Sequence, residues 1–439
     1  MANTLPFPGR HGVNDAGHLT IGGCDALELA ATFGTPLYVF DEQLIRDNLR
    51  AYRAAIPGSL YAAKAFLTVA MAQLVASEGV GLDVVSGGEL ATALRAGFPA
   101  ERIVMHGNNK SPAELAEAVS AGVGRIVVDS HRELLMLDEI ARSMQRHPAI
   151  HLRITPGIKP DTHTYIQTGQ LDSKFGTPIA DGQAQQLIID ALNCSSIRLS
   201  GLHCHIGSQL FDLAGLEAAM RLMVDLMAET RAATGAALPE LNIGGGLGIR
   251  YRNQDTPPDI ATYAAHLIET ITARCAVHDL PVPRLLCEPG RSIVGEAGVT
   301  LYTVGTIKDV PGIRTYLAVD GGMTDNPRPA LYEAVYEATV ASRPAAPATK
   351  IVTVAGKCCE SGDILIRDVA LPEPQPGDIL AVFATGAYNY AMASHYNRLP
   401  KPAVVFCKDG EAHLIVERET YADLYAKDLP LPRAASVTL

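Results

Sequence analysis

The sequence lacks any long apolar run. No stretch of about 18 or more uninterrupted apolar residues, which could span a bilayer, occurs. Hydrophobic residues make up 48% of the chain and charged residues 19%, the composition of a soluble globular enzyme. The first 18 residues contain two prolines and no apolar core of a secretory signal. We therefore expect a cytoplasmic protein without membrane contact.

Basic runs and paired cysteine motifs are also missing. The formal charge of -11, without a cluster of lysine or arginine, argues against a nucleic-acid partner. The 8 cysteines are irregularly spaced, as expected of reduced thiols and not of a disulfide framework. Because no C-x-x-C pair occurs, a structural zinc site has little support, and we predict no metal.

With 439 residues the chain is too long for one ordinary core, which favours two domains. From about residue 58 to 290 it repeats an apolar or β-branched run, a turn and an Ala/Leu/Glu-rich helical stretch. The repeated runs are LYAAKA, GLDVVS, RIVMHG, RIVVDS, AIHLRITPG, IRLSGLHCHIG, LPELNIGGG and PRLLCEPG. Eight repeats in this length fit a (β/α)8 barrel of about 250 residues better than an open doubly wound sheet.

After Gly290 the sequence changes to short strand-like runs separated by proline and glycine, which predicts a mostly β second domain. These runs include TLYTVGTIKDV, RTYLAVDGG, KIVTVAGK, DILAVFATG and PAVVFCKDG. The early runs HLTIGG and PLYVFD are also strand-like. We therefore predict an α/β protein, a TIM-type barrel plus a mostly β domain. The predicted parts are an N-terminal segment (1–40) packing with the β domain, a barrel (41–292) and the C-terminal β domain (293–439).

Reactive residue types collect where the predicted strands end. In a barrel these ends form the active-site face. The residues at these ends are Lys64, Asp83, Ser86, His106, Asn108, His203, His205, Ser208, Gly244 to Gly246, Glu288 and Arg291.

Lys64 lies in the apolar run YAAKAF, where an unpaired ammonium would be costly. A Schiff base would remove that cost. From these six residues alone, a lysine that extends to solvent is the better explanation.

The turn from Gly244 to Gly248 can direct backbone N–H groups at a phosphate, or can simply be a tight turn. The buried carboxylate of Glu288 needs a partner, which could be a pyridinium nitrogen or Arg291. Neither alternative is favoured by the local sequence.

His203 and His205 lie on one face of a strand. They could bind a metal as a pair, fill the core as ordinary buried histidines, or offer a flat surface to an aromatic cofactor. Without a third ligand, metal is the least favoured. Cys358 and Cys359 are adjacent and therefore unlinked, with Cys358 expected to be a buried structural thiol.

Taken together, the motifs resemble the fold-type III pyridoxal-phosphate (PLP) dependent decarboxylases along residues 20 to 425. Within that family they resemble the branch that acts on meso-diaminopimelate. The motifs are YAAKAF, GLDVVSGGEL, HGNNKS, DSKFG, GLHCHIGSQ, NIGGGLG, CEPGRSIV, DGGMTDNPRPALY, CCESGD and GAYNYAMASHYN.

The resemblance implies specific roles. Lys64 would form the Schiff base with pyridoxal 5'-phosphate, His205 would stack on its ring and Glu288 would face the ring nitrogen. The phosphate would be held by Ser208, Gly244, Gly245 and Gly246. Further cofactor contacts would come from Asp83, Pro289, Gly290, Arg291 and Tyr388. Substrate contacts would come from Arg291, Arg328, Tyr332, Glu360 and Tyr388. Cys359 would be the proton donor.

The implied reaction is decarboxylation of meso-2,6-diaminopimelate to L-lysine and CO2, the last step of lysine biosynthesis. It implies a homodimer with shared sites, because Cys359 and Glu360 reach the neighbouring subunit's cofactor in the family. A related racemase is disfavoured because it has an arginine where this chain has Glu288. A non-catalytic PLP-binding regulator is also disfavoured, because inactive regulators tend to lose the lysine or the thiol and this chain has both Lys64 and Cys359. Ornithine, lysine, arginine and carboxynorspermidine remain alternative substrates, although CCESGD and RPALY favour diaminopimelate.

Overall fold

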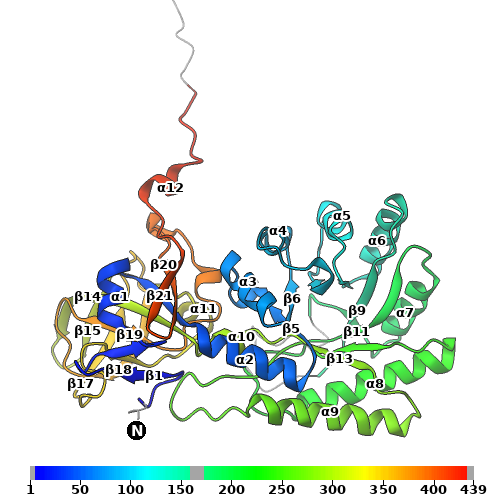
Figure 1. The fold of residues 1–439 in the computed structure, drawn as a ribbon, viewed down its shortest axis with the longest axis horizontal. Helices are drawn as coiled ribbons and strands as arrows, with labels where there is room; N and C mark the ends of the chain where they lie inside the picture. Colours follow the sequence, from blue (N-terminus) through cyan, green and yellow to red (C-terminus); the bar gives the residue numbers. More distant parts are fainter. Residues whose placement is uncertain (1–4, 159–172, 433–439) are drawn as a thin grey trace, which may run out of the picture.

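The computed structural model describes residues 5–158 and 173–432 and has two parts, a barrel and a mostly β region (Figure 1). Asp172, which begins the DSKFG motif, lies outside the described residues. Within the described ranges, no helix is long and apolar enough to cross a bilayer.

The barrel strands are parallel, and every run predicted for it from the sequence forms one of them. They are β5 (Gly58–Ala62), β6 (Gly81–Val84), β7 (Ile103–Met105), β8 (Arg125–Val128), β9 (Ala149–Thr155), β11 (Arg198–His203), β12 (Glu240–Asn242) and β13 (Arg284–Cys287). The sheet runs in the order β9-β11-β12-β13-β5-β6-β7-β8, and pairing of β8 with β9 closes it. A short strand, β10 (Thr177–Pro178), adds to β9. The predicted barrel is therefore confirmed.

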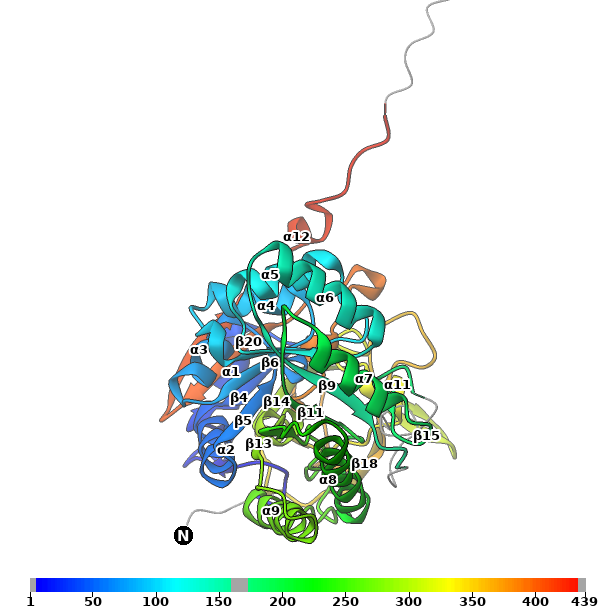
Figure 2. The same ribbon diagram turned by 90° about the vertical axis from the view of Figure 1, so that its right-hand side faces the viewer.

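Helices surround these strands (Figure 2). They are α2 (Glu42–Ala55), α3 (Val69–Ser77), α4 (Gly87–Arg95), α5 (Pro112–Ala121), α6 (His131–Ser143), α7 (Gln183–Asn193), α8 (Ala214–Thr234) and α9 (Ile260–Val277). Although α2 precedes the first barrel strand, it packs between α9 and α3. The helix that completes the ring next to β13 is thus supplied from the start of the barrel, because only the single turn α10 (Arg291–Val294) follows β13.

Serine residues at strand ends begin the next helices. The Ser86 side chain accepts a hydrogen bond from the Glu89 N–H, and Ser130 accepts one from Glu133, as N-caps of α4 and α6. Ser111 and Glu114 form a reciprocal capping box on α5. Ser86, which the sequence placed among the reactive strand-end residues, therefore caps a helix.

The barrel interior is layered. An apolar cluster is formed by Leu60, Val104, Val127 and Leu286, one residue from each of four strands. At the amino ends of β8 and β12, Arg125 forms an ion pair with Glu240 at 2.7 Å, and His151 contacts the same carboxylate at 2.8 Å. The opposite end of the barrel, where the carboxyl ends of the strands meet, contains the candidate site described below.

The β region is built around the long strand β14 (Gly298–Val310). Its sheet has the order β18-β17-β15-β14-β4-β20-β21, and β19 joins β14 to β16. The other strands are β15 (Arg314–Val319), β16 (Ala338–Val340), β17 (Lys350–Ala355), β18 (Ile364–Leu371), β19 (Ile379–Val382), β20 (Ala403–Lys408) and β21 (Glu411–Val416). The sequence pointed to β14, β15, β17, β19 and β20 but not to β16, β18 or β21. Their burial does not follow a strict alternation, which removes the usual signal.

An N-terminal strand belongs to this sheet. β4 (Leu37–Asp41) pairs antiparallel with β14 and parallel with β20. Before it lie β1 (His11–Val13), β2 (Leu19–Ile21) and β3 (Cys24–Asp25), which form a small sheet, and α1 (Ala26–Phe33). The segment before the barrel thus packs with the C-terminal part, while the domain limits given above stay a prediction.

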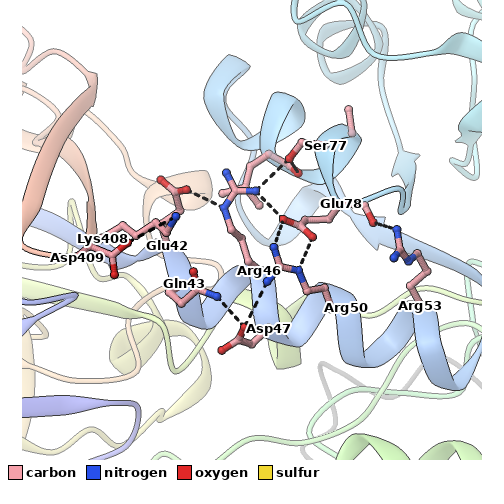
Figure 3. A network of polar contacts seen from close by, with 12 residues as sticks. Glu42, Gln43, Arg46, Asp47, Arg50, Arg53, Ser77, Glu78, Lys408 and Asp409 are labelled. Carbon is pink, nitrogen blue, oxygen red and sulfur yellow. Dashed lines mark hydrogen bonds and ion pairs between the residues drawn. The ribbon is translucent and has the colours of Figure 1, made fainter.

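A buried carboxylate ties α2 to the end of α3 (Figure 3). Glu78 accepts hydrogen bonds from Arg46 Nη1 at 2.6 Å and from Arg50 Nε at 2.7 Å, and Arg53 donates to its carbonyl oxygen at 2.6 Å. Burial by itself would raise the pKa of Glu78, but the two guanidinium groups outweigh it and lower the pKa. The ionised carboxylate therefore stabilises the packing of the ring-completing helix.

We expect Glu78→Gln to lower the free energy of unfolding by about 1–2 kcal/mol, because one charged partner of two arginines is lost. The pKa of Glu78 is lowered on folding, so the difference should be present above the unfolded glutamate pKa of about 4.3. It should disappear as the pH falls through the folded value. Urea unfolding at several pH values measures it. Glu139→Gln, at an exposed position of α6, is the matched control. Equal losses in both variants would contradict the role of the network.

Candidate active site

A cavity opens at the carboxyl ends of the barrel strands. It encloses about 420 Å³ of space, part of it open to solvent. Most of the predicted cofactor residues line it, together with Leu247 and Ser292, which the sequence did not indicate. The predicted residues among the lining are Lys64, Asp83, His205, Ser208, Gly245, Gly246, Glu288, Gly290, Arg291 and Tyr388.

Lys64 does not end a strand, as the sequence suggested. β5 ends at Ala62, and Lys64 lies in the following 3-10 turn (Ala63–Ala65). Both alanines of that turn are buried, whereas the Lys64 side chain is exposed in the cavity. The turn thus presents one amine to the cavity, and the burial cost expected from the sequence does not arise.

Glu288, directly after β13, is a buried carboxylate with three partners. Its Oε1 lies 2.7 Å from His106 Nε2 and accepts a hydrogen bond from Asn242 Nδ2 at 2.6 Å. Its Oε2 contacts His203 Nε2 at 3.2 Å. Arg291 is not among these partners, because its guanidinium bonds to Ser208 and Tyr251. The salt bridge between Glu288 and Arg291 that the sequence left open is therefore not formed.

These partners decide the charge of Glu288. Burial by itself would raise its pKa, but His106 and His203 outweigh burial and hold the pKa well below its usual range. Burial lowers the pKa of His203 to about 3, so this ring is neutral and donates from Nε2. Burial opposes a charge on His106 as well, but Asp83 and Glu288 raise its pKa. Glu288 is thus an ionised acceptor inside the barrel mouth.

Asp83 approaches the same nitrogen of His106 as Glu288 does, with Oδ1 3.6 Å from Nε2. Burial raises the pKa of Asp83 to about 7. The three side chains therefore form one cluster around His106 Nε2, in which Glu288 is the ionised carboxylate and burial gives Asp83 the raised pKa.

The glycine turn after β12 has no room for side chains. Gly244 has φ +66 and Gly246 φ +134, a region that side-chain-bearing residues rarely adopt. A Cβ atom on Gly245 would lie 2.3 Å from the carbonyl oxygen of Glu288. The turn can therefore bring backbone N–H groups close to a bound anion. Of the predicted cofactor residues, Gly244 and Pro289 do not line the cavity but support the turn and the strand end beneath it.

Two buried arginines meet at one tyrosine. Arg291 Nη1 and Arg328 Nη1 lie 2.5 and 2.9 Å from the hydroxyl of Tyr251. Burial would raise the pKa of Tyr251, but the two guanidinium groups lower it. Arg328, in α11 (Arg328–Tyr332), also bonds to Tyr336. The cluster concentrates positive charge beside the cavity, although Arg328 itself does not line it.

Flat groups flank the same space. The Arg291 guanidinium lies 4.8 Å from the centre of the Tyr388 ring, and the Tyr388 N–H bonds to the Ala65 carbonyl beside Lys64. Burial, and then the charge of Lys64, hold the pKa of His205 well below its usual value. His205 is thus a neutral imidazole facing the cavity.

Three predicted residues lie away from this cavity. Cys359 and Glu360 are exposed on the β region, and Tyr332 is half-buried at the end of α11. Cys358 is buried, as the sequence predicted, and burial raises its pKa to about 11. Asn108, another strand-end candidate, is exposed.

The sequence showed no third ligand for a metal beside the histidine pair, but the fold brings further possible ligands close to His203. His106, His203 and Glu288 offer ligand atoms within 4.8 Å of one another. Glu288 already lies 2.7 Å from His106 Nε2 and 3.2 Å from His203 Nε2, so the arrangement is explained by the charge of Glu288. The absence of a functional metal stays a prediction.

Sequence reasoning missed two residues of the site. Tyr251 lies in a loop without a recognisable motif, and only the fold brings it to the arginines. Asn242 was within a quoted motif, and its burial at a strand end next to the glycine turn was the available signal.

The residues fit a phosphorylated aromatic aldehyde. Lys64 offers an amine, the glycine turn excludes side chains from an anion, and ionised Glu288 can accept a hydrogen bond from a protonated ring nitrogen. Residues 42–295 match the model of the pyridoxal binding domain of pyridoxal-dependent decarboxylases. The barrel and its site thus define a pyridoxal-dependent decarboxylase.

Relatives narrow the family. The chain is 51% identical over 423 residues to diaminopimelate decarboxylase of Bacillus subtilis, covering 95% of this chain and 96% of that protein. Among solved structures, diaminopimelate decarboxylase from M. jannaschii, in complex with L-lysine, matches with a TM-score of 0.90 and 37% identity over 97% of this chain and 99% of that one. Diaminopimelate decarboxylase from Helicobacter pylori, complexed with L-lysine, matches with a TM-score of 0.84 and 33% identity. The match covers 92% of this chain and 98% of that one. The chain belongs to the diaminopimelate decarboxylase family.

Gly245→Ala should weaken PLP binding by roughly ten- to a hundredfold, the cost of about one lost hydrogen bond to a charged group. The added Cβ would meet the Glu288 carbonyl oxygen at 2.3 Å and push the turn away from an anion. Titration of the apoprotein with PLP measures the change. Gly305→Ala, whose Cβ would lie 3.6 Å from its nearest neighbour in the β region, should bind as the unmodified chain does. Normal affinity of the Gly245 variant would remove the turn from the binding site.

Proposed function

We propose that this chain decarboxylates meso-2,6-diaminopimelate to L-lysine and CO2, with pyridoxal 5'-phosphate bound in the cavity at the barrel mouth. The observation that carries the proposal is one cavity lined by Lys64, the glycine turn and an ionised buried Glu288. Family membership supports the same activity.

In this proposal the ends of the cavity hold different parts of the cofactor. Lys64 binds the aldehyde carbon and Glu288 accepts a hydrogen bond from the ring nitrogen. Ser208 and the turn from Gly244 to Gly246 hold the phosphate, and Arg291, bonded to Ser208, adds positive charge there. The Gly245 N–H donates to His205 Nδ1 at 3.3 Å, so the donor of the turn assigned to the anion is the Gly246 N–H. Neutral His205 stacks on the ring without adding a competing charge.

When bound, PLP supplies an electron-withdrawing ring that accepts the electron pair left at the substrate Cα as CO2 departs. Ionised Glu288 keeps the ring nitrogen protonated and so strengthens that withdrawal. Lys64 would hold the aldehyde carbon of the cofactor when no substrate is bound. A thiol, assigned to Cys359, delivers the proton to Cα.

Recognition of the distal end of the substrate requires opposite charges. Meso-diaminopimelate has an ammonium and a carboxylate there, and the arginines joined by Tyr251 supply the positive side. Glu360 is assigned to the ammonium, with Tyr332 and Tyr388 completing the contacts. L-lysine lacks the distal carboxylate and would leave a buried arginine without its anion.

Glu360 and Cys359 point to a homodimer. Both are exposed in one chain and lie away from the cavity containing Lys64. A second copy whose Cys359 and Glu360 enter this cavity would complete the site. The roles proposed for Cys359 and Glu360 therefore require that the active site lies at the interface between two subunits.

The purified protein with PLP should release equimolar CO2 and L-lysine from meso-diaminopimelate. It should turn over L-lysine or ornithine at least about tenfold more slowly, because a charged hydrogen bond is worth about 1.5–3 kcal/mol. Lys64→Ala should lose turnover and the borohydride-sensitive visible absorbance of bound PLP. Product analysis and absorbance spectra measure both. Equal rates of turnover on lysine and diaminopimelate would contradict the proposed substrate and would indicate a decarboxylase of another substrate class.

A mixing experiment tests the shared site. Lys64→Ala and Cys359→Ala should each be inactive, and their mixture should regain up to about a quarter of normal activity after subunit exchange, since mixed dimers contain one intact site. Tagged subunits verify exchange, and Cys358→Ala mixed with Lys64→Ala is the matched control. A mixture that exchanges but stays inactive would mean that each site is built from one chain.

A further inference from the structure

One buried amide joins the two ends of the site. Asn242 is the last residue of β12 and is fully buried. Its Oδ1 accepts a hydrogen bond from the Gly244 N–H at 3.0 Å, and its Nδ2 donates to Glu288 Oε1 at 2.6 Å. A backbone N–H can only donate and a carboxylate can only accept, so these partners fix which way the amide faces.

The contacts of Glu288 are unequal. Oε1 receives the two short contacts, from Asn242 at 2.6 Å and His106 at 2.7 Å, whereas Oε2 lies 3.2 Å from His203. A carboxylate oxygen has two lone-pair positions. Oε1 is therefore the anchored oxygen, and Oε2 keeps the capacity to accept a further hydrogen bond from the cavity.

The strand register places these groups side by side. His203 in β11 pairs with Asn242 in β12, which pairs with Leu286 in β13, two residues before Glu288. The Glu288 N–H also bonds to the Gly244 carbonyl oxygen at 2.8 Å. The glycine turn and the carboxylate are thus held by backbone and side chain together.

We propose that Asn242 is a positioning residue that ties Glu288 Oε1 to the glycine turn, so that Oε2 would be held available to the ring nitrogen of PLP. The inference rests on the proposed function, because it assigns Glu288 to the ring nitrogen. Hydrogen bonds onto Oε1 weaken the basicity of the carboxylate and therefore keep the shared proton on the ring nitrogen. Asn242 itself touches neither cofactor nor substrate in this assignment.

Asn242→Asp gives the sharpest test, because it changes one atom of the side chain. One oxygen of the new carboxylate still accepts from Gly244, but the other meets Glu288 Oε1 at the 2.6 Å of the present contact. The pair must share a proton, which is lost as the pH rises. Relative to the unmodified protein, PLP affinity of the apoprotein should therefore fall by roughly ten- to a hundredfold from low to high pH.

A reciprocal exchange separates this effect from a loss of packing. In Asn242→Asp combined with Glu288→Gln, the amide and the carboxylate trade places across this contact, so no pair of carboxylates shares a proton. The fall of PLP affinity with rising pH should disappear, while the affinity itself stays low because the ring nitrogen has lost its carboxylate partner. Asn193→Asp, exposed at the end of α7, has the same charge change and should behave as the unmodified chain.

The ring nitrogen provides a readout independent of activity. In the unmodified protein, bound PLP labelled with 15N in the ring should give the NMR shift of a protonated pyridine. In Asn242→Leu the signal should move toward the unprotonated value, with kcat reduced by roughly ten- to a hundredfold and KM little changed. If Asn242→Leu does not fold, the aspartate variant and its reciprocal exchange decide the question.

The outcomes distinguish the two levels of the proposal. If the unmodified protein does not bind PLP, the proposed function is wrong and this inference falls with it. If it binds PLP and decarboxylates, but Asn242→Asp shows the same pH profile and 15N shift, only the role of Asn242 is overturned.

Discussion

The ionised carboxylate of Glu288 is the group around which the barrel mouth is organised. A buried charge is costly unless it is paired and hydrogen-bonded. Here His106, His203 and Asn242 contact it from three other strands or strand ends. Because these partners come from β7, β11 and β12, Glu288 can remain ionised only when the sheet has closed and the carboxyl ends of the strands meet.

The same closure explains the remainder of the cavity. The turn after β5 presents Lys64 to the cavity while its alanine neighbours stay buried. The turn after β12 needs glycine because the backbone of Glu288, directly after β13, lies against it. The β region contributes from outside the barrel. Arg328 reaches Tyr251 and thereby Arg291, and Tyr388 bonds to the Lys64 turn. The second part of the molecule therefore supplies one wall of the site.

The N-terminal segment and α2 connect the two parts. β4 lies in the sheet of the β region, and α2, which follows it directly, completes the helix ring of the barrel. The arginines of α2 hold Glu78 at the end of α3 (Figure 3). The chain thus enters the β region, builds the barrel and returns, which fixes the orientation of the β-region wall relative to the barrel mouth.

The sequence by itself determined the barrel, because each strand carries its own apolar run and Ala/Leu/Glu-rich helical stretches separate the runs. It also identified most residues that line the cavity, because a parallel barrel brings strand ends together and motifs mark those ends. Only the tertiary structure decided the partners. Whether Glu288 meets Arg291 or His106, and whether Asn242 faces the glycine turn, depends on side chains far apart in sequence. The local sequence pattern does not reveal which of these side chains lie close together, because strand register and barrel closure set the distances between them.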